Sequence, residues 1–193
     1  MADPTALRLA NTIRATSGGL TDAFATTDSV RDWLTANAPE LGEFLDPATF
    51  VPTEQDRAAL VELRQHVRAL FAKAVAPEPP SGADASALPP FPEALAALNA
   101  AAAPLVRELH WDAAGPSLRT RLLTTDELHT VKAVLADAAI EFCTGPTLPQ
   151  VRVCPAPRCV LYFLKGHPRQ EWCSVACGNR ARAARHYHQH RAE

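Results

Sequence analysis

The stretch CPAPRCVLYFLKGHPRQEWCSVAC, residues 154–177, contains four of the five cysteines of this chain. Cys154 and Cys159 are separated by four residues, 13 residues follow, and Cys173 and Cys177 are separated by three. This spacing is typical of two short knuckles that place four thiolates around one tetrahedral zinc ion. Two disulfides, reduced cysteines without a metal and an iron–sulfur cluster are the alternatives. We therefore expect one structural Zn²⁺ at these four residues.

The second cysteine pair also predicts the start of a helix. Cys173 and Cys177 lie one helical turn apart, so both sulfurs can face the same way if a helix begins near Ser174, a good N-cap residue. Before this pair, residues 160–164 read as a strand, and residues 170–172 are expected to return beside it. Zinc binding should contribute most of the folding free energy of this segment, on the order of 10 kcal/mol. Its aromatic residues are expected to form a small core and a docking surface rather than base-stacking platforms: Tyr162, Phe163 and Trp172.

The residues around the last cysteine carry a resemblance to a known family. The segment 154–187, in which Trp172-Cys173-Ser174 leads into Cys177-Gly178-Asn179-Arg180, resembles the CGNR zinc finger. This finger closes a family of bacterial proteins expected to be stress-induced transcription regulators. Their N-terminal domain, ABATE, opens with a short apolar segment ending in Asn-Thr, and residues 7–12 (LRLANT) are similar to it. The loop 165–170 departs from the family pattern because it is shorter and less basic.

The resemblance implies two domains. Residues 1–145 would form a helical ABATE-like domain that senses a signal or oligomerises. Residues 151–193, which we call the zinc module, would form a treble-clef-like unit of a β-hairpin and a helix around one zinc ion. The partners that follow are double-stranded DNA, a small-molecule effector and a second copy of the chain.

Charge is distributed unevenly along the chain. The net charge of the chain is −2. Residues 1–150 contain 11 Lys and Arg and 19 Asp and Glu, which gives a net charge of −8. Residues 151–193 contain 8 Lys and Arg and 2 Asp and Glu, which gives a net charge of +6. A zinc ion with four thiolates adds about −2 to the zinc module, which stays basic. An acidic body with a basic end is the layout of a protein that presents one element to phosphates. A merely solvated charged helix is the alternative.

The helix expected after Ser174 carries the candidate DNA-binding residues, which are Asn179, Arg180, Arg182, Arg185 and Arg191. They surround much of the helix, so little of it can be buried, and a thin, alanine-rich helix with arginines fits a major groove. Arg180 has a competing role beside the zinc–thiolate centre. Asn179 can instead cap the zinc knuckle or bond the backbone. His186 and His190 are one turn apart and can chelate a second metal, but a solvated tail is favoured.

Helix patterns dominate the rest of the chain. One amphipathic run starts at the capping-box-like Thr53 and Asp56 and should end near Ala76, and another runs from about Thr125 to the stop at Gly145. Shorter helices are expected at residues 6–15, 29–36 and 92–103. Residues 106–111 and 118–122 alternate about a Gly-Pro turn at 115–116 and predict a β-hairpin. The fold class expected is therefore mainly α with a small β-hairpin.

Two proline-rich stretches interrupt the helices. Residues 77–92 contain six prolines and too little apolar material to order themselves, so we expect a mobile loop within the first domain. A second break at residues 144–150 separates the first domain from the zinc module.

A function for the first domain is less legible. Asn11, Arg14 and Trp33, together with His66 and His129, can line a ligand pocket, although capping, core-edge or surface roles are the alternatives. The sequence contains no Ser-His-Asp order, glycine-rich phosphate loop, His-Glu-x-x-His or paired-carboxylate motif, so we expect no enzyme.

The compartment expected is the cytoplasm. No secretory segment opens the sequence, and the longest uncharged apolar stretch, residues 94–106, is too short to span a bilayer and contains Pro104, so no membrane partner is expected. The fifth cysteine, Cys143, is expected to sit reduced at the end of a helix, with redox sensing as the alternative.

These features favour a zinc-dependent transcription regulator that binds DNA through its C-terminal helix. The alternative is a zinc-stabilised adaptor for protein–protein interaction, in which the arginines meet carboxylates and DNA is not bound.

Overall fold

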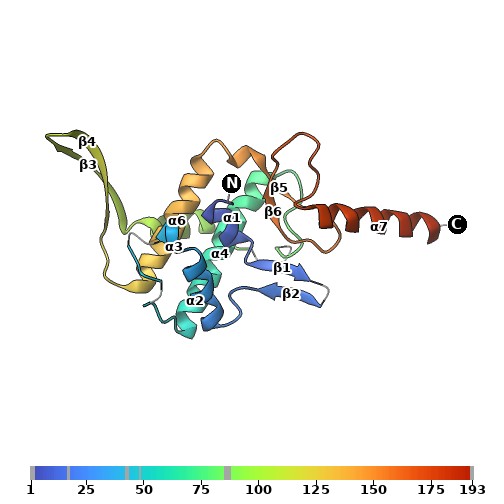
Figure 1. Ribbon diagram of the computed structural model, residues 1–193, viewed down its shortest axis with the longest axis horizontal. Helices are drawn as coiled ribbons and strands as arrows, with labels where there is room; N and C mark the ends of the chain where they lie inside the picture. The colour runs from blue at the N-terminus through green and yellow to red at the C-terminus, as the bar shows by residue number, and fades with distance from the viewer. Residues whose placement is uncertain (1–2, 17, 42–43, 48, 85–87, 192–193) are drawn as a thin grey trace.

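A helical body carries two projections that point in opposite directions (Figure 1). The computed structural model describes residues 3–16, 18–41, 44–47, 49–84 and 88–191. The elements follow in the order α1 (Thr5–Ala10), β1 (Ile13–Thr16), β2 (Gly19–Asp22), α2 (Thr27–Ala36), α3 (Ala38–Leu41), α4 (Glu54–Val75), α5 (Phe91–Ala102), β3 (Leu105–Asp112), β4 (Gly115–Leu122), α6 (Glu127–Thr144), a 3-10 turn (Leu148–Gln150), β5 (Val151–Val153), β6 (Tyr162–Leu164) and α7 (Val175–Arg191). The predicted fold class, mainly helical with small hairpins, is confirmed.

Helix α4 runs through the body and contacts α1, α5 and α6. Its start is the predicted capping box: the Thr53 hydroxyl accepts from the Asp56 N–H at 3.2 Å, and the Asp56 carboxylate accepts from the Thr53 N–H at 2.7 Å. In the core, the ring of Phe71 lies 5.4 Å from that of Phe142 and 5.5 Å from that of Tyr162. Because Tyr162 belongs to the zinc module, the core of the body extends into that module.

Four of the five predicted helices of the body match the structure closely. The runs expected from Thr53 and from about Thr125 are α4 and α6, and α6 is capped by the Asp126 carboxylate, which accepts from the His129 N–H. The shorter helices expected at residues 29–36 and 92–103 are α2 and α5. Among the described residues, none of these helices combines the length and the apolar composition needed to cross a membrane.

The prediction of a helix over residues 6–15 is wrong beyond Ala10. There α1 ends, and Ile13–Thr16 forms strand β1, paired antiparallel with β2. Gly19, the first residue of β2, has φ +125°, a backbone conformation that residues with a Cβ rarely adopt. Asn11 ends the helix, and its side chain donates to the carbonyl of Tyr162 in strand β6.

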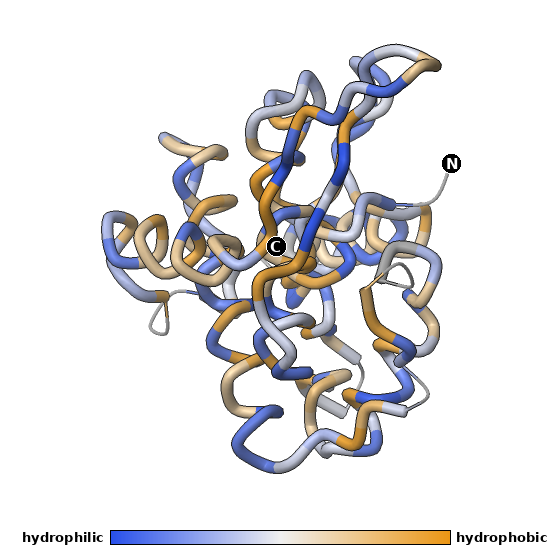
Figure 2. The backbone as a smooth tube through the Cα atoms, turned by 90° about the vertical axis from the view of Figure 1, so that its left-hand side faces the viewer, coloured by the Kyte–Doolittle hydropathy of each residue, from blue (hydrophilic) through white to orange (hydrophobic). Residues whose placement is uncertain are grey.

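The predicted hairpin is confirmed as a long projection, which we call the hairpin arm (residues 105–122). Its turn is centred on Ala113 and Ala114, so Gly115 and Pro116 belong to β4 rather than to the turn. Figure 2 looks from the side on which the arm projects and shows hydrophobic and hydrophilic residues alternating along its strands. At the base, the Arg107 guanidinium bonds to carboxylates of α6, those of Asp137 at 2.7 Å and Glu141.

The proline-rich loop between α4 and α5 is attached to the rest of the molecule through polar groups. Ser81 and Asp84 are buried, and the Ser81 hydroxyl donates to the carbonyl of Val160 at 2.8 Å. The sequence did not indicate these contacts, because they are hydrogen bonds and the prediction considered only the low apolar content of the loop. Mobility of the loop stays a prediction.

Candidate metal centre and C-terminal helix

The four predicted zinc ligands meet at one point of the structure. The sulfur atoms of Cys154, Cys159, Cys173 and Cys177 all lie within 4.8 Å of one another. The Sγ–Sγ distances are 3.8 Å for Cys159–Cys173, 3.8 Å for Cys159–Cys177 and 3.4 Å for Cys173–Cys177. A tetrahedral zinc ion with Zn–S bonds of about 2.3 Å requires edges of about 3.8 Å, so the donor set fits Zn²⁺. None of the cysteines is in a disulfide.

The first knuckle is a tight turn after strand β5. The Cys154 N–H donates to the carbonyl of Leu161 at 3.0 Å, and the Cys159 N–H donates to that of Ala156 at 2.9 Å. Arg158 takes the left-handed conformation with φ 60°, which reverses the chain just before the second ligand. The sulfurs of both ligands are thereby brought to the same side of the turn.

The second knuckle is the start of α7, as predicted. The helix begins at Val175, and the Ser174 hydroxyl accepts from the Cys177 N–H at 3.2 Å. The Cys173 N–H donates to the Cys154 sulfur at 3.5 Å, so backbone of the second knuckle also contacts the first. Structural zinc sites commonly show such N–H···S contacts because a thiolate is a good acceptor of charge-assisted bonds.

The close approach of the four thiols affects their pKa values and favours a bound cation. Hydrogen bonds from Cys159 and Cys173 lower the pKa of the Cys154 thiol, and the same contacts raise the pKa of Cys159 and of Cys173. Without a cation, ionisation of one thiol therefore opposes ionisation of its neighbours, and the four thiols do not all lose their protons together. A divalent ion reverses this, because coordination deprotonates each thiol.

Each residue of the Cys177-Gly178-Asn179-Arg180 sequence has a contact of its own. An added Cβ at Gly178 would lie 3.0 Å from the ring of Trp172, so a side chain there would require the indole to shift by a few tenths of an ångström. The Asn179 side-chain oxygen accepts from the Arg182 guanidinium at 2.6 Å, and that guanidinium lies 5.7 Å from the centre of the Trp172 ring.

Arg180 faces the metal centre. Its Nη2 donates to the Cys177 sulfur at 3.0 Å, and its Nε is buried. A guanidinium in this place offsets the negative charge that four thiolates leave on a zinc centre. The contact favours the supporting role for Arg180 over the DNA-contacting one.

Family models match both parts of this arrangement. Residues 3–146 match the ABATE model, described as a "putative stress-induced transcription regulator", and residues 150–190 match the CGNR zinc finger. The chain belongs to the ABATE family. Its four clustered cysteines form the zinc-binding site of the CGNR finger. No curated protein shows significant sequence similarity to the chain.

One detail of the predicted zinc module is wrong in this ABATE protein. Residues 170–172 do not return beside β6; its antiparallel partner is β5, in the register Val151↔Leu164 to Val153↔Tyr162. The Gln170 side chain instead accepts from the Gly166 N–H at 2.8 Å and closes the intervening loop. The predicted aromatic core also divides, because Phe163 packs beside the cysteines with Trp172, whereas Tyr162 packs in the body.

Asn11 joins the ABATE domain to the zinc module. Its side chain pairs with β6 as another strand would: Nδ2 donates to the Tyr162 carbonyl at 2.8 Å, and Oδ1 accepts from the Tyr162 N–H at 3.1 Å. Of the other predicted pocket residues, Arg14 is exposed on β1, and Trp33 packs edge-on against Phe24 at 5.3 Å. The Arg14 Nε donates to the Asn11 carbonyl at 3.4 Å, whereas Trp33 has a separate partner, and a ligand site formed by the three residues stays a prediction.

A buried polar cluster of Arg68, Ser81, Asp84 and Tyr162 completes the junction. The Arg68 guanidinium, fully buried, donates to the Asp84 carboxylate at 2.6 and 3.0 Å, to the Val160 carbonyl at 3.1 Å and to the Ala10 carbonyl. The Tyr162 hydroxyl donates to the same carboxylate at 2.8 Å. Burial raises the pKa of this hydroxyl, which therefore remains a donor. The cluster ties α1, α4 and the proline-rich loop to the zinc module. Sequence reasoning missed it.

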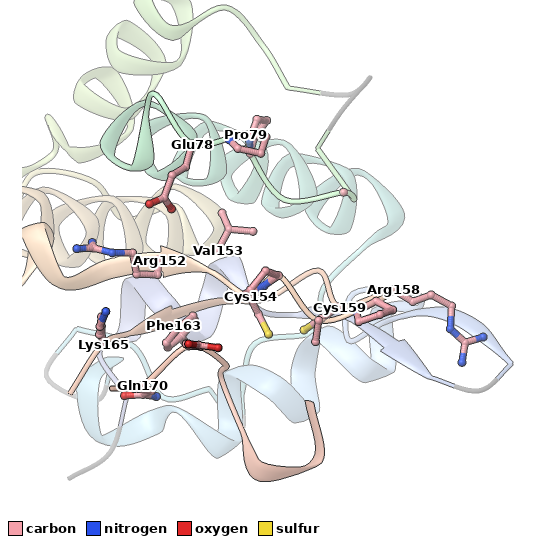
Figure 3. Close-up of a pocket in the computed structure, with 16 residues that line it drawn as sticks. Glu78, Pro79, Arg152, Val153, Cys154, Arg158, Cys159, Phe163, Lys165 and Gln170 are labelled. Carbon is pink, nitrogen blue, oxygen red and sulfur yellow. The ribbon is translucent and has the colours of Figure 1, made fainter. Parts of the chain in front are cut away.

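Two cavities adjoin these elements. One of about 720 Å³ lies between the proline-rich loop and the first knuckle; Figure 3 shows Cys154, Cys159 and Phe163 on its wall, with Arg158 extending away. The other, of about 350 Å³, lies among α4, α5 and α6 and is lined by both His66 and His129, which the sequence nominated as pocket residues. Burial lowers the pKa of His66.

Proposed function

We propose that this chain is a zinc-dependent transcription regulator that binds double-stranded DNA through α7, while the ABATE domain senses a signal or mediates oligomerisation. The observation that carries the proposal is the position of α7, which leaves the metal centre and projects away from the body (Figure 1). At 17 residues the helix is about 25 Å long, and a major groove admits a helix of this kind.

The side chains of α7 support a charged partner. Arg182 and Arg185 are exposed, and the residues between them are alanines. The zinc module carries 8 Lys and Arg against 2 Asp and Glu, so its field favours phosphates. The side chains of His190 and Arg191 lie outside the described residues, so the second metal site and the contact predicted there stay predictions. We assign DNA contact to Arg182 and Arg185, with Asn179 as the residue that orients Arg182.

The experiment is a mobility-shift titration of the zinc-loaded protein against its own upstream DNA over a series of salt concentrations. Arg182→Ala combined with Arg185→Ala should weaken binding about tenfold or more and reduce the slope of log K against log salt by about 1 to 2, because two phosphate contacts are lost. Arg119→Ala combined with Arg121→Ala removes the same charge from exposed sites of the ABATE domain and should leave both quantities unchanged. Zinc content and circular dichroism verify the fold of each variant.

Equal binding by the two double variants would contradict the role given to α7. Wild-type protein that binds no DNA at low salt would favour the adaptor function, in which the arginines of α7 meet carboxylates of a protein partner. A chelator-treated sample tests the zinc requirement, because the metal positions α7.

Three further assignments accompany this proposal. We infer two units, residues 1–145 and 151–193, and the limits of the two family matches, at 146 and 150, support this division. We infer a cytoplasmic location, because a reducing compartment keeps thiolates available for zinc. We assign no reaction, since both matched families are described by regulation and zinc binding rather than by catalysis.

A further inference from the structure

The hairpin arm has one apolar and one charged face. Alternate cross-strand pairs share a face, and four of the eight pairs form the first: Leu105–Leu122, Arg107–Thr120, Leu109–Leu118 and Trp111–Pro116. The other four form the second face: Val106–Arg121, Glu108–Arg119, His110–Ser117 and Asp112–Gly115. An antiparallel ribbon of this kind normally buries its apolar face.

The body covers only the base of the apolar face. Leu105 and Leu122 are half-buried there, and Arg107 is held by the carboxylates of α6. Farther out, Leu109 is 75% exposed, Trp111 70% and Leu118 66%. The face that packs on the body therefore continues into solvent as an apolar end made of three large side chains.

We propose that this end of the hairpin arm is a dimerisation surface, and that its occupant is the same surface of a second copy of the chain. The charges fit this partner. Leu109, Trp111, Pro116 and Leu118 bring no charge to the surface, so two copies can meet about a twofold axis without burying an ion. The acidic and basic side chains, including the Glu108–Arg121 pair at 2.7 Å, lie on the opposite face and stay in water.

The area also fits. Three side chains exposed to this degree present roughly 400 Å² of apolar surface per copy, which is the size of a functional patch. Two such patches with the flanking strands approach the lower limit of a specific interface, about 1,200 Å² in total. Within the part of the chain that the structure describes, β3 and β4 pair only with each other, so each also has an open edge that a second ribbon can extend.

The position of the arm is compatible with the rest of the molecule. The arm and α7 lie at opposite ends (Figure 1), so pairing through the arms leaves both α7 helices uncovered. The dimer does not require DNA, and its test contains none; failure of this inference and failure of DNA binding are therefore separate results.

The test is the mass of the zinc-loaded full chain by light scattering and sedimentation across the micromolar range. The wild type should approach twice 20.8 kDa, and Leu109→Ser combined with Trp111→Ser should raise the dissociation constant at least about 100-fold, giving a monomer. Leu20→Ser combined with Val51→Ser is the matched control, since these residues are 62% and 72% exposed outside the arm and their loss should leave the dimer intact. Unchanged zinc content and circular dichroism show that each variant is folded.

A second measurement uses the unaltered protein. Amide exchange of residues 105–122 should slow as the concentration rises through the dissociation constant, and exchange of α7 should not change. A wild type that stays monomeric, a double variant that still dimerises, or concentration-dependent protection confined to other segments would each overturn the inference. A monomer would leave the apolar end to a different protein.

Discussion

Arg68 is the residue at which α1, α4, the proline-rich loop and the zinc module meet. In the sequence it belongs to an amphipathic helix, and the periodicity identifies the apolar neighbours but gives no reason to bury an arginine among them. The guanidinium is fully buried yet bonded to a carboxylate and to carbonyls of two other segments. A buried charge of this kind persists only where its partners are in place.

Loss of the partner carboxylate should therefore be costly. Asp84→Asn leaves Arg68 charged and buried without an anion, and we expect the free energy of unfolding to fall by about 3 to 5 kcal/mol. Asp28→Asn is the matched control, because the Arg31–Asp28 pair at 3.1 Å is exposed and should contribute less than about 1 kcal/mol. Urea denaturation of the zinc-loaded proteins measures both. Similar losses of unfolding free energy in the two variants would show that the buried pair contributes no more to stability than the exposed one.

Other single residues differ in how far the sequence revealed them. The four cysteines were predictable because their spacing is typical of a tetrahedral zinc site. Asn11 was noticed as part of an Asn-Thr motif, but its partner Tyr162 lies 151 residues away, and local patterns carry no information on such a distance. Cys143 was expected at a helix end, where it lies; burial raises the pKa of its thiol to about 11, which leaves little reactive thiolate for redox sensing at neutral pH.

Among the elements, α7 depends on a close contact at its first turns. Gly178 sits inside the helix, where glycine normally costs about 1 kcal/mol relative to alanine. The Trp172 ring, 3.0 Å from the position of an added Cβ, explains why glycine is present. Propensity and packing therefore oppose each other at this position.

The packing should prevail when the glycine is replaced. Gly178→Ala should shift the Trp172 ring beside the metal centre by a few tenths of an ångström and lower zinc affinity about tenfold, despite the gain in helix propensity. Competition with a chromophoric chelator measures the affinity. Ala183→Gly, at an exposed position of the same helix, should weaken the helix by about 1 kcal/mol without changing zinc affinity. Unchanged affinity in Gly178→Ala would mean that the Trp172 contact does not support the centre.

The long elements were predictable, and so was strand β6, which lies within the strand expected at residues 160–164, but the short strands β1 and β5 were not. Capping signals and apolar periodicity located α4 and α6, because many residues of a long helix repeat the same information. The four residues of β1 and the three of β5 are too few to show a period. Pairing of β5 with β6 is set by contacts with the body and by closure around the cysteines, neither of which propensity describes.

At the scale of the whole molecule, the metal centre and the ABATE domain share one core. The sequence predicted two units from the proline-rich break at 144–150, and nothing in it indicated that β6 would contact α1 or that β5 would contact α4. The uneven charge and the exposed helix were predictable from composition. The opposite directions of the hairpin arm and α7 were not, because they depend on tertiary packing.

Zinc removal should consequently loosen parts of the ABATE domain. With a chelator, amide exchange should accelerate in residues 151–177 and also in the described loop residues 77–84 and at the end of α1, because their hydrogen bonds end on β6 and on Val160. The hairpin arm makes no contact with the zinc module among the described contacts and serves as the internal control. Acceleration confined to the zinc module would show that the two units fold independently.

The pairing of Asn11 with β6 has a consequence for protein engineering. In a chimera that joins residues 150–190 to an unrelated host, the main chain at Tyr162 would lack the amide of Asn11. The Tyr162 side chain would also lack the ring of Phe71 against which it packs. We expect the donor finger to transfer intact only into a recipient that offers both. Exchange of fingers between relatives should therefore succeed where residues equivalent to both Asn11 and Phe71 are present.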